Sequence, residues 1–326
     1  MRAILIDEPG DETVLKIGEA PAPELGPGQL RIGVGAAAVN RADLLQRQGL
    51  YPPPPGASPL LGLECAGEVL EVGPGVEGWR PGDRAMALLA GGGYAEQVVV
   101  HAGSAMPVPE RLSIEEAAAV PEVFLTVFLN VFQLGALPAE GAVLVHGGGS
   151  GIGTATIQLA RAAGATCIVT AGSDEKCRRC LELGADRAVD YRSGDFAAEV
   201  ADATEGRGVD VVLDSIGAPY LAGNLKSLAV GGRLVLIGLM GGARGEINLG
   251  VLLARRLQVI GSTLRARPVE EKAAIVSGFL ERFGADLEAG RIGPVVDRVV
   301  PLEQVADAHR AMKASEHFGK IVLKVG

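Results

Sequence analysis

The sequence predicts an α/β protein of two domains, one built on a doubly wound parallel sheet and the other mostly β. Three observations lead to this prediction. The chain has 326 residues, more than the usual domain length of about 100–200. Its first third contains short apolar or alternating runs separated by glycine- and proline-rich turns. From residue 142 onward, strand-like and helix-like segments alternate, which is typical of a parallel sheet with helices on both faces.

The first region should supply short strands, at 3–6, 29–39, 64–73, 83–88 and 95–100. Past Pro121 the pattern changes to an apolar helix. Its apolar side chains recur at helical spacing on nearly every face, which predicts a buried helix and the start of a second domain. The uncharged stretch 123–139 also contains Asn130, Gln133 and Pro138, which suits a core helix better than a membrane span.

The second domain should contain six parallel strands, at 142–146, 166–171, 187–190, 209–214, 233–238 and 257–262. Helices are expected between them, at 151–163, 174–183, 196–203, 220–228 and 249–255. After this series we expect an amphipathic helix over 269–285 and a final strand within 319–325.

Composition excludes several classes of protein. The net charge of −9 provides no positive field for nucleic acid or an anionic membrane, and we expect neither partner. Glycine makes up 47 residues, about twice its usual share, but without the collagen period. Four cysteines and a start without signal-peptide character favour a soluble protein of the reducing cytoplasm.

A glycine-rich segment, VHGGGSGIG, joins the first strand of the alternating series to its helix. The spacing departs from a strict G-x-G-x-x-G, but bare backbone can still approach a pyrophosphate whose charge lies at the helix start. Tight helix–sheet packing alone is the alternative. We expect a Rossmann-type domain whose loop binds a dinucleotide through Gly149, Ser150, Gly151, Ile152 and Gly153.

The end of the second strand of this domain should decide which dinucleotide binds. Gly172 stands there instead of an acid, Ser173 can donate a hydrogen bond, and Lys176 follows one helical turn later. This favours the 2′-phosphate of NADPH. The alternative is that Asp174 or Glu175 holds a ribose hydroxyl of NADH while Lys176 is merely solvated.

Metal-ligand patterns are absent. The four histidines form no i, i+3 or i, i+4 pair, and none is close to a cysteine in sequence. Cys177 and Cys180 have a ligand-like spacing but fall on an expected helix with no second pair. We therefore expect no metal.

Taken together, the motifs resemble the zinc-free medium-chain dehydrogenase/reductase family, in its quinone oxidoreductase (zeta-crystallin-like) branch and closest to the tumour-suppressor-inducible type. The resemblance runs from end to end, through VNRADLLQRQGLYPPPPGASPLLGLECAGEV, VGPGVEGWRPGDRAMALLAGGGYAE, LVHGGGSGIGTATIQLARAAGA, TAGSDEKC, LGADRAVDYR, GVDVVLDSIG, GGRLVLIG and HFGKIVLKV. It implies a GroES-like catalytic domain formed by 1–121 and 267–326, with the tail returning to it, and a Rossmann domain at 122–266.

The resemblance also implies site residues. Asn40 and Leu63 stand where zinc-dependent relatives carry ligands, and the lobe that holds a structural zinc is absent, in agreement with the histidine pattern. Asn40, Asp43 and Tyr51 would line the cleft near the nicotinamide. Other residues would contact the cofactor: Thr126 at its ribose, Gly149 to Gly153 at the pyrophosphate, Gly172, Ser173, Lys176 and Tyr191 at the 2′-phosphate, and Ile237, Gly238, Leu239, Thr263 and Leu264 at the carboxamide. Gly147 replaces the alanine that often begins the family's phosphate loop.

Four of these residues also have ordinary structural interpretations. Tyr51 could anchor its proline-rich loop by packing, Asn40 could cap a turn, Asp43 could cap the helix that follows, and Tyr191 could be a packing residue.

With no metal and no evident nucleophile, the expected activity is zinc-independent hydride transfer from NADPH to a quinone. The alternatives are reduction of an enone or enal by the same cofactor, and a non-enzymatic crystallin-like or RNA-binding role. We also expect a homodimer, because the apolar strand within 257–265 should lie at a sheet edge. A helix from Val269 covering that edge would instead give a monomer.

Overall fold

The computed structural model describes residues 1–326 and divides into two compact units. Unit 1 comprises Met1–Leu125, Leu264–Gly290 and Pro294–Gly326, and unit 2 comprises Thr126–Thr263 and Arg291–Gly293. The sequence places these boundaries a few residues away, at 121/122 and 266/267.

Unit 2 is built on a six-stranded sheet in which every neighbouring pair is parallel. The strand order is β10-β9-β8-β11-β12-β13, the doubly wound order 3-2-1-4-5-6. The strands are β8 (Ala142–His146), β9 (Thr166–Ala171), β10 (Arg187–Asp190), β11 (Val209–Asp214), β12 (Leu228–Leu236) and β13 (Gln258–Gly261). This confirms the predicted parallel sheet; the main difference is that β12 begins five residues earlier than expected, at Leu228 rather than 233.

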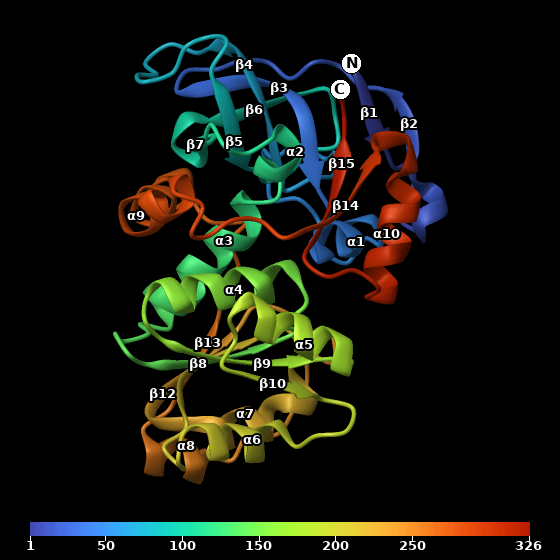
Figure 1. Cartoon of the computed structure of the whole chain (residues 1–326). Coiled ribbons are helices and arrows are strands. Elements are labelled where there is room, and N and C mark those ends of the chain that lie inside the picture. Colours follow the sequence, from blue (N-terminus) through green and yellow to red (C-terminus); the bar gives the residue numbers. More distant parts are fainter. The chain divides into compact units, whose positions relative to one another are not determined.

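Helices cover both faces of this sheet, with α4 and α5 on one side and α6, α7 and α8 on the other (Figure 1). Their bounds are α4 (Gly151–Ala162), α5 (Asp174–Leu183), α6 (Phe196–Ala203), η4 (Ala218–Tyr220), α7 (Leu221–Ser227) and α8 (Leu249–Arg255). The strands of the sheet centre are apolar on both faces because helices bury both. Every residue of β8 is buried, for example.

Unit 1 contains a seven-stranded sheet centred on β3 (Gln29–Ala38), which pairs antiparallel with β4, β6 and β15. Its other strands are β4 (Glu64–Val72), β5 (Arg84–Leu88), β6 (Gln97–His101), β7 (Ala105–Pro107), β14 (Val296–Pro301) and β15 (Lys320–Lys324). A separate hairpin joins β1 (Arg2–Leu5) to β2 (Lys16–Glu19). The pairing of β15 with β3 brings the last residues of the chain into the sheet of its first third.

The helices of unit 1 are short except for one. They are η1 (Glu12–Val14), α1 (Arg41–Arg47), η2 (Ala102–Ser104), α2 (Ile114–Ala117), α3 (Pro121–Val127), α9 (Val269–Glu288), η5 (Leu302–Gln304) and α10 (Val305–Ala314). The boundary between the units falls inside α3, which continues as a π-helical segment, η3 (Phe128–Leu134). Sequence analysis missed β14 and α10. The strand β14 is a partly exposed edge strand in which charged residues interrupt the apolar run.

The apolar helix expected after Pro121 is buried as predicted, with Val123, Phe124, Val127 and Val131 at most 3% exposed. The helical stretch Ile114–Leu134 has the length and composition of a membrane span, but 83% of its most apolar window is buried inside the structure. Such burial is typical of a core helix.

Candidate functional site

The glycine-rich segment forms a loop between β8 and α4. Ser150 caps the helix: its Oγ accepts from the Gly153 amide at 3.0 Å and donates to the Gly147 carbonyl at 2.7 Å. The first amide groups of a helix have no intrahelical acceptor, so those of Gly151 and Ile152 are available to an anion. All five residues predicted for the pyrophosphate lie in this loop or the first turn of α4.

The four residues predicted for the 2′-phosphate gather where β9 and β10 end. Ser173 caps α5, its Oγ accepting from the Lys176 amide at 3.2 Å. The Tyr191 hydroxyl lies so close to Gly172 that a Cβ there would come within 2.7 Å of it, which is one reason the position is glycine. Tyr191 is still 44% exposed, so its ring offers a surface as well as packing.

The other predicted cofactor contacts of unit 2 belong to the same edge of the sheet. Ile237, Gly238 and Leu239 follow β12, and Thr263 follows β13. Because parallel strands have their carboxyl ends at one edge, these segments face the same side as the glycine loop. Leu264 lies in unit 1 and is buried.

Thr126 lies on α3, one turn before Asn130, which sequence analysis did not assign to a site. Asn130 is 1% exposed; its Nδ2 donates to the Thr126 carbonyl at 2.8 Å, and its Oδ1 has no hydrogen-bond partner. Buried polar atoms normally have a hydrogen-bond partner, and π-helical segments often lie at functional sites. The Asn130 amide oxygen is therefore a place where a ligand could donate a hydrogen bond.

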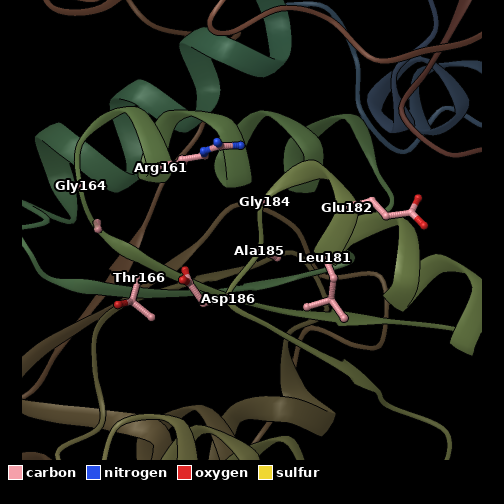
Figure 2. Close-up of a pocket in the computed structure, with 9 residues that line it drawn as sticks. Arg161, Gly164, Thr166, Leu181, Glu182, Gly184, Ala185 and Asp186 are labelled. Atoms are coloured by element: carbon pink, nitrogen blue, oxygen red, sulfur yellow. The ribbon is translucent and has the colours of Figure 1, made fainter.

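A pocket of about 530 Å³ lies at the opposite end of β9 and β10 (Figure 2), lined by Arg161, Gly164, Ala165, Thr166, Leu181, Glu182, Gly184, Ala185 and Asp186. One of its carboxylates is occupied, because Asp186 accepts from the Cys167 amide at 2.7 Å. Ligands of doubly wound sheets bind at the carboxyl ends of the strands, so this pocket is not the nucleotide site.

A buried polar chain supports the carboxyl ends of β8, β9 and β11, and sequence analysis missed it. His146 Nε2 lies 2.7 Å from Asn224 Oδ1 and its Nδ1 lies 3.0 Å from Thr170 Oγ1, while Asn224 Nδ2 donates to Asp214 at 2.9 Å. Burial lowers the pKa of His146 to about 4, so the ring is neutral and can accept at Nδ1. The chain fixes the strand ends from which the glycine loop begins.

In unit 1, Asn40 and Asp43 are buried and their polar atoms are occupied. Asp43 accepts from the Asn40 amide at 2.8 Å, the Gly62 amide at 3.1 Å and the Tyr94 hydroxyl at 3.1 Å. Burial nevertheless raises the pKa of Asp43 to about 6. The first of these bonds caps α1, so the geometry favours the structural interpretation of Asp43.

The Tyr94 hydroxyl continues this network to His309, at 3.3 Å from Nε2, and Nδ1 of His309 lies 3.3 Å from Arg47. Arg47 is completely buried, and desolvation together with this cation lowers the pKa of His309 to about 3. A neutral ring therefore donates to Tyr94 and accepts from Arg47.

A second network surrounds the side chain of Asn40. Its Nδ2 donates to Glu64 Oε1 at 2.9 Å, and its Oδ1 accepts from Lys320 at 2.6 Å. The Lys320 ammonium also contacts Glu64 Oε1 at 2.7 Å and the Val39 carbonyl at 3.0 Å, which uses all three of its donors. The other oxygen of Glu64 accepts from the Glu122 amide at 2.8 Å. The positions of these residues in the sequence do not predict this arrangement.

Tyr51 differs from Asn40 and Asp43 because its hydroxyl makes no hydrogen bond within the chain. The Arg265 guanidinium stacks 5.3 Å from the centre of its ring and donates to the Tyr51 carbonyl at 3.1 Å. Two further Arg265 N–H groups donate to the Ala90 carbonyl at 2.8 Å and to Gln46 Oε1 at 2.6 Å. Arg265 thus holds the loop of Tyr51 in place and leaves the phenol free for a ligand.

The structure contains no group of three or more histidine, cysteine, aspartate or glutamate side chains with the geometry of a metal site. The two sequence positions compared with zinc ligands hold Asn40, engaged as described, and Leu63, which is 1% exposed.

Two family models match the chain: the alcohol dehydrogenase GroES-like domain over residues 26–110 and the zinc-binding dehydrogenase model over residues 151–278. Quinone oxidoreductase of Rattus norvegicus is 33% identical over 99% of this chain and 97% of its own length. A phthioceranic/hydroxyphthioceranic acid synthase of Mycobacterium tuberculosis is 36% identical over 98% of this chain, which spans only 15% of that much longer relative.

Solved structures give the same picture. The Escherichia coli quinone oxidoreductase complexed with NADPH superposes with a TM-score of 0.87 at 29% identity, covering all of both chains. An NAD-dependent alcohol dehydrogenase gives 0.86 at 36% identity, again over all of both chains. The CurF ER cyclopropanase of curacin A biosynthesis gives 0.85 at 25% identity, covering 100% of this chain and 99% of that one. Fold, family models and an end-to-end relative agree, and this chain belongs to the medium-chain dehydrogenase/reductase family.

Proposed function

We propose that this protein is an NADPH-dependent oxidoreductase that reduces a quinone by hydride transfer without a metal. When bound, the cofactor supplies the hydride from its nicotinamide ring. The residues of the chain bind and orient it, and the observation that carries the proposal is the arrangement at the end of β9. No acid occupies the position at the end of β9 that would hold a ribose hydroxyl. Ser173 caps the following helix, and Lys176 lies in the first turn of that helix.

The surroundings of α5 favour NADPH over NADH. Asp174 and Glu175, the acids that could hold a ribose, are exposed, whereas Lys176 is half-buried. The solved relatives differ in their cofactor, since one is described as complexed with NADPH and another as NAD-dependent. The lysine therefore decides our assignment.

Replacing Lys176 with alanine should weaken NADPH binding by about 1–3 kcal/mol and leave NADH almost unchanged, because only NADPH carries the phosphate that this ammonium would contact. Titration with both cofactors measures the difference. Arg178→Ala, an exposed change of the same charge on the same helix, is the matched control and should affect neither. Equal losses for both cofactors in the Lys176 variant would disprove the assignment.

The acceptor is tested by the loss of reduced-nicotinamide absorbance with a quinone, with an enone and with neither. The enone is the second candidate, because relatives of this chain include the ER cyclopropanase and segments of mycobacterial synthases. Faster turnover of the quinone supports the proposal, and turnover of the enone alone would replace it. Consumption of neither would leave a cofactor-binding protein without this activity.

Chelator treatment should leave the reductase activity unchanged, and elemental analysis should find less than one zinc per chain. The physical reason is the lack of a converging ligand set in either unit. Activity that disappears with a chelator and returns with zinc would contradict this prediction.

We also propose a homodimer formed through β13. This strand is the edge of its sheet, and Val259 on it is 38% exposed. Leu249 and Leu253 of α8, the helix that precedes β13 in the chain, are 68% and 82% exposed. An edge strand with an exposed valine, preceded in the chain by a helix with exposed leucines, is suited to pairing with a second copy about a twofold axis.

Light scattering at micromolar concentration should give twice the chain mass, and Leu253→Asp should reduce it to one chain. Val230→Asp, at an apolar position of unit 2 that is 58% exposed on β12, should leave the dimer intact. A monomeric mass for the unmodified protein would refute the dimer.

A further inference from the structure

Glu122 is a carboxyl group that the site described so far does not use. It is the second residue of α3, and its backbone amide donates to Glu64, which takes the place of a capping side chain. Its own carboxyl oxygens make no hydrogen bond or ion pair, although the residue is half-buried. They are not sealed from solvent, because they are absent from the fully buried polar atoms that lack a partner.

The cations around Glu122 are committed elsewhere. Lys320 uses its three donors on Val39, Asn40 and Glu64, and Arg265 is bonded to Ala90, Tyr51 and Gln46. Lys272 donates to the Arg265 carbonyl at 2.7 Å and forms no ion pair with Glu122. No cation therefore stabilises a carboxylate at this position through direct contact.

Charged groups face Glu122 from every neighbouring element. Glu64 on β4 and Asp43 on α1 oppose a negative charge there, while Lys320 on β15 and Lys272 on α9 favour it. Burial and the Glu64 carboxylate prevail and raise the pKa of Glu122 to about 8. At neutral pH this side chain is mostly a neutral acid that carries a proton.

Tyr51 is a second proton carrier whose hydroxyl makes no hydrogen bond within the chain, and the Glu122 charge acts on it electrostatically. Burial and the Glu122 charge both raise the pKa of Tyr51 above its ordinary value, against the opposing effect of Arg265. A phenol whose proton is held this tightly is a weaker donor near pH 7 than the carboxyl beside it.

We propose that Glu122 is the proton donor of the reduction, an inference that rests on the proposed function. The acceptor gains a hydride from the bound cofactor and one proton from the Glu122 carboxyl. The O–H bond of the carboxyl breaks, and a new O–H bond forms on a quinone or a C–H bond on an enone. The resulting Glu122 carboxylate then takes a proton from water.

Glu122 lies one turn from Thr126 on the same face of α3, so a single helix carries the donor and a proposed contact of the nicotinamide ribose.

The test compares Glu122→Gln, Tyr51→Phe and the unmodified enzyme across pH with a quinone and an enone. Glu110→Gln, an exposed change of the same kind in unit 1, is the control and should behave like the unmodified enzyme. The unmodified kcat should be level below pH 8 and fall tenfold per pH unit above it, because the donor must be protonated. In Glu122→Gln this fall should vanish, and enone turnover should drop by about 10²–10⁴-fold with NADPH affinity intact.

A second measurement does not depend on turnover. The infrared band of a protonated carboxyl should be present at pH 7 in the unmodified protein, disappear as the pH rises past 8, and be missing in Glu122→Gln. Unchanged kcat and pH profile in Glu122→Gln would overturn the role of Glu122, as would a band that this substitution does not remove. A loss of turnover and of its pH dependence in Tyr51→Phe alone would assign the proton to Tyr51 instead. Failure of the unmodified enzyme to reduce either acceptor would overturn the proposed function itself.

Discussion

Replacing Gly153 with alanine is expected to weaken dinucleotide binding on the order of 100-fold or more. An added Cβ would lie 2.4 Å from the Gly147 carbonyl oxygen and 2.5 Å from backbone atoms of Gly148. Both belong to the phosphate loop, so the loop must move to make room. Overpacking of this kind costs about 1–3 kcal/mol and more where, as here, only backbone can yield. The displaced loop would no longer present its amides to a pyrophosphate.

Cofactor titration of the purified variant measures this loss. Gly284→Ala is the matched control: it is also a helical glycine, but a Cβ there would meet only the Leu280 side chain at 3.8 Å. That substitution should leave binding unchanged and stabilise α9 slightly, since alanine has the higher helix propensity. Normal binding by Gly153→Ala would mean that the loop does not hold the pyrophosphate.

Most elements of unit 2 could be predicted to within a few residues because their signals are local. α5 begins and ends at the predicted residues, Asp174 and Leu183: Ser173 caps its start, and Gly184 adopts the left-handed conformation that ends it. The glycine loop and the residues after β9 could be assigned for the same reason. Each lies directly after a strand that the hydrophobic pattern already marks.

The network of unit 1 could not be predicted in this way, because its members are far apart in sequence. Lys320 and Asn40 are separated by 280 positions, and Arg47 and His309 by 262. Nothing in the local sequence marks Glu122 as a neighbour of Glu64, so the raised pKa of Glu122 becomes visible only once β4, β15 and α3 are assembled. Asn40 and Asp43 were singled out by resemblance, and only the folded chain shows that their polar atoms are already occupied.

The second large effect is expected from Lys320→Met, which should destabilise the protein by about 3–5 kcal/mol. Lys320 is 3% exposed and Glu64 is completely buried. Removing the ammonium leaves the Glu64 carboxylate without its cation, and it leaves Asn40 Oδ1 without the hydrogen bond that Lys320 donates. The methionine fills the same volume, which separates the electrostatic loss from a cavity. Denaturant unfolding gives the free energy directly.

Two further variants make this measurement specific. Lys324→Met changes the same residue type on the same strand, but Lys324 is exposed and lies 3.4 Å from the partly exposed Glu115, a surface pair worth less than about 1 kcal/mol. Adding Glu64→Gln to Lys320→Met removes the uncompensated charge and should recover part of the lost stability, with a coupling of about 0.5–3 kcal/mol. If Lys320→Met is no worse than Lys324→Met, then Glu64 is not held as a buried ion pair. The charge that raises the pKa of Glu122 would then have to come from elsewhere, so this stability measurement also tests the basis of the proposed proton donor.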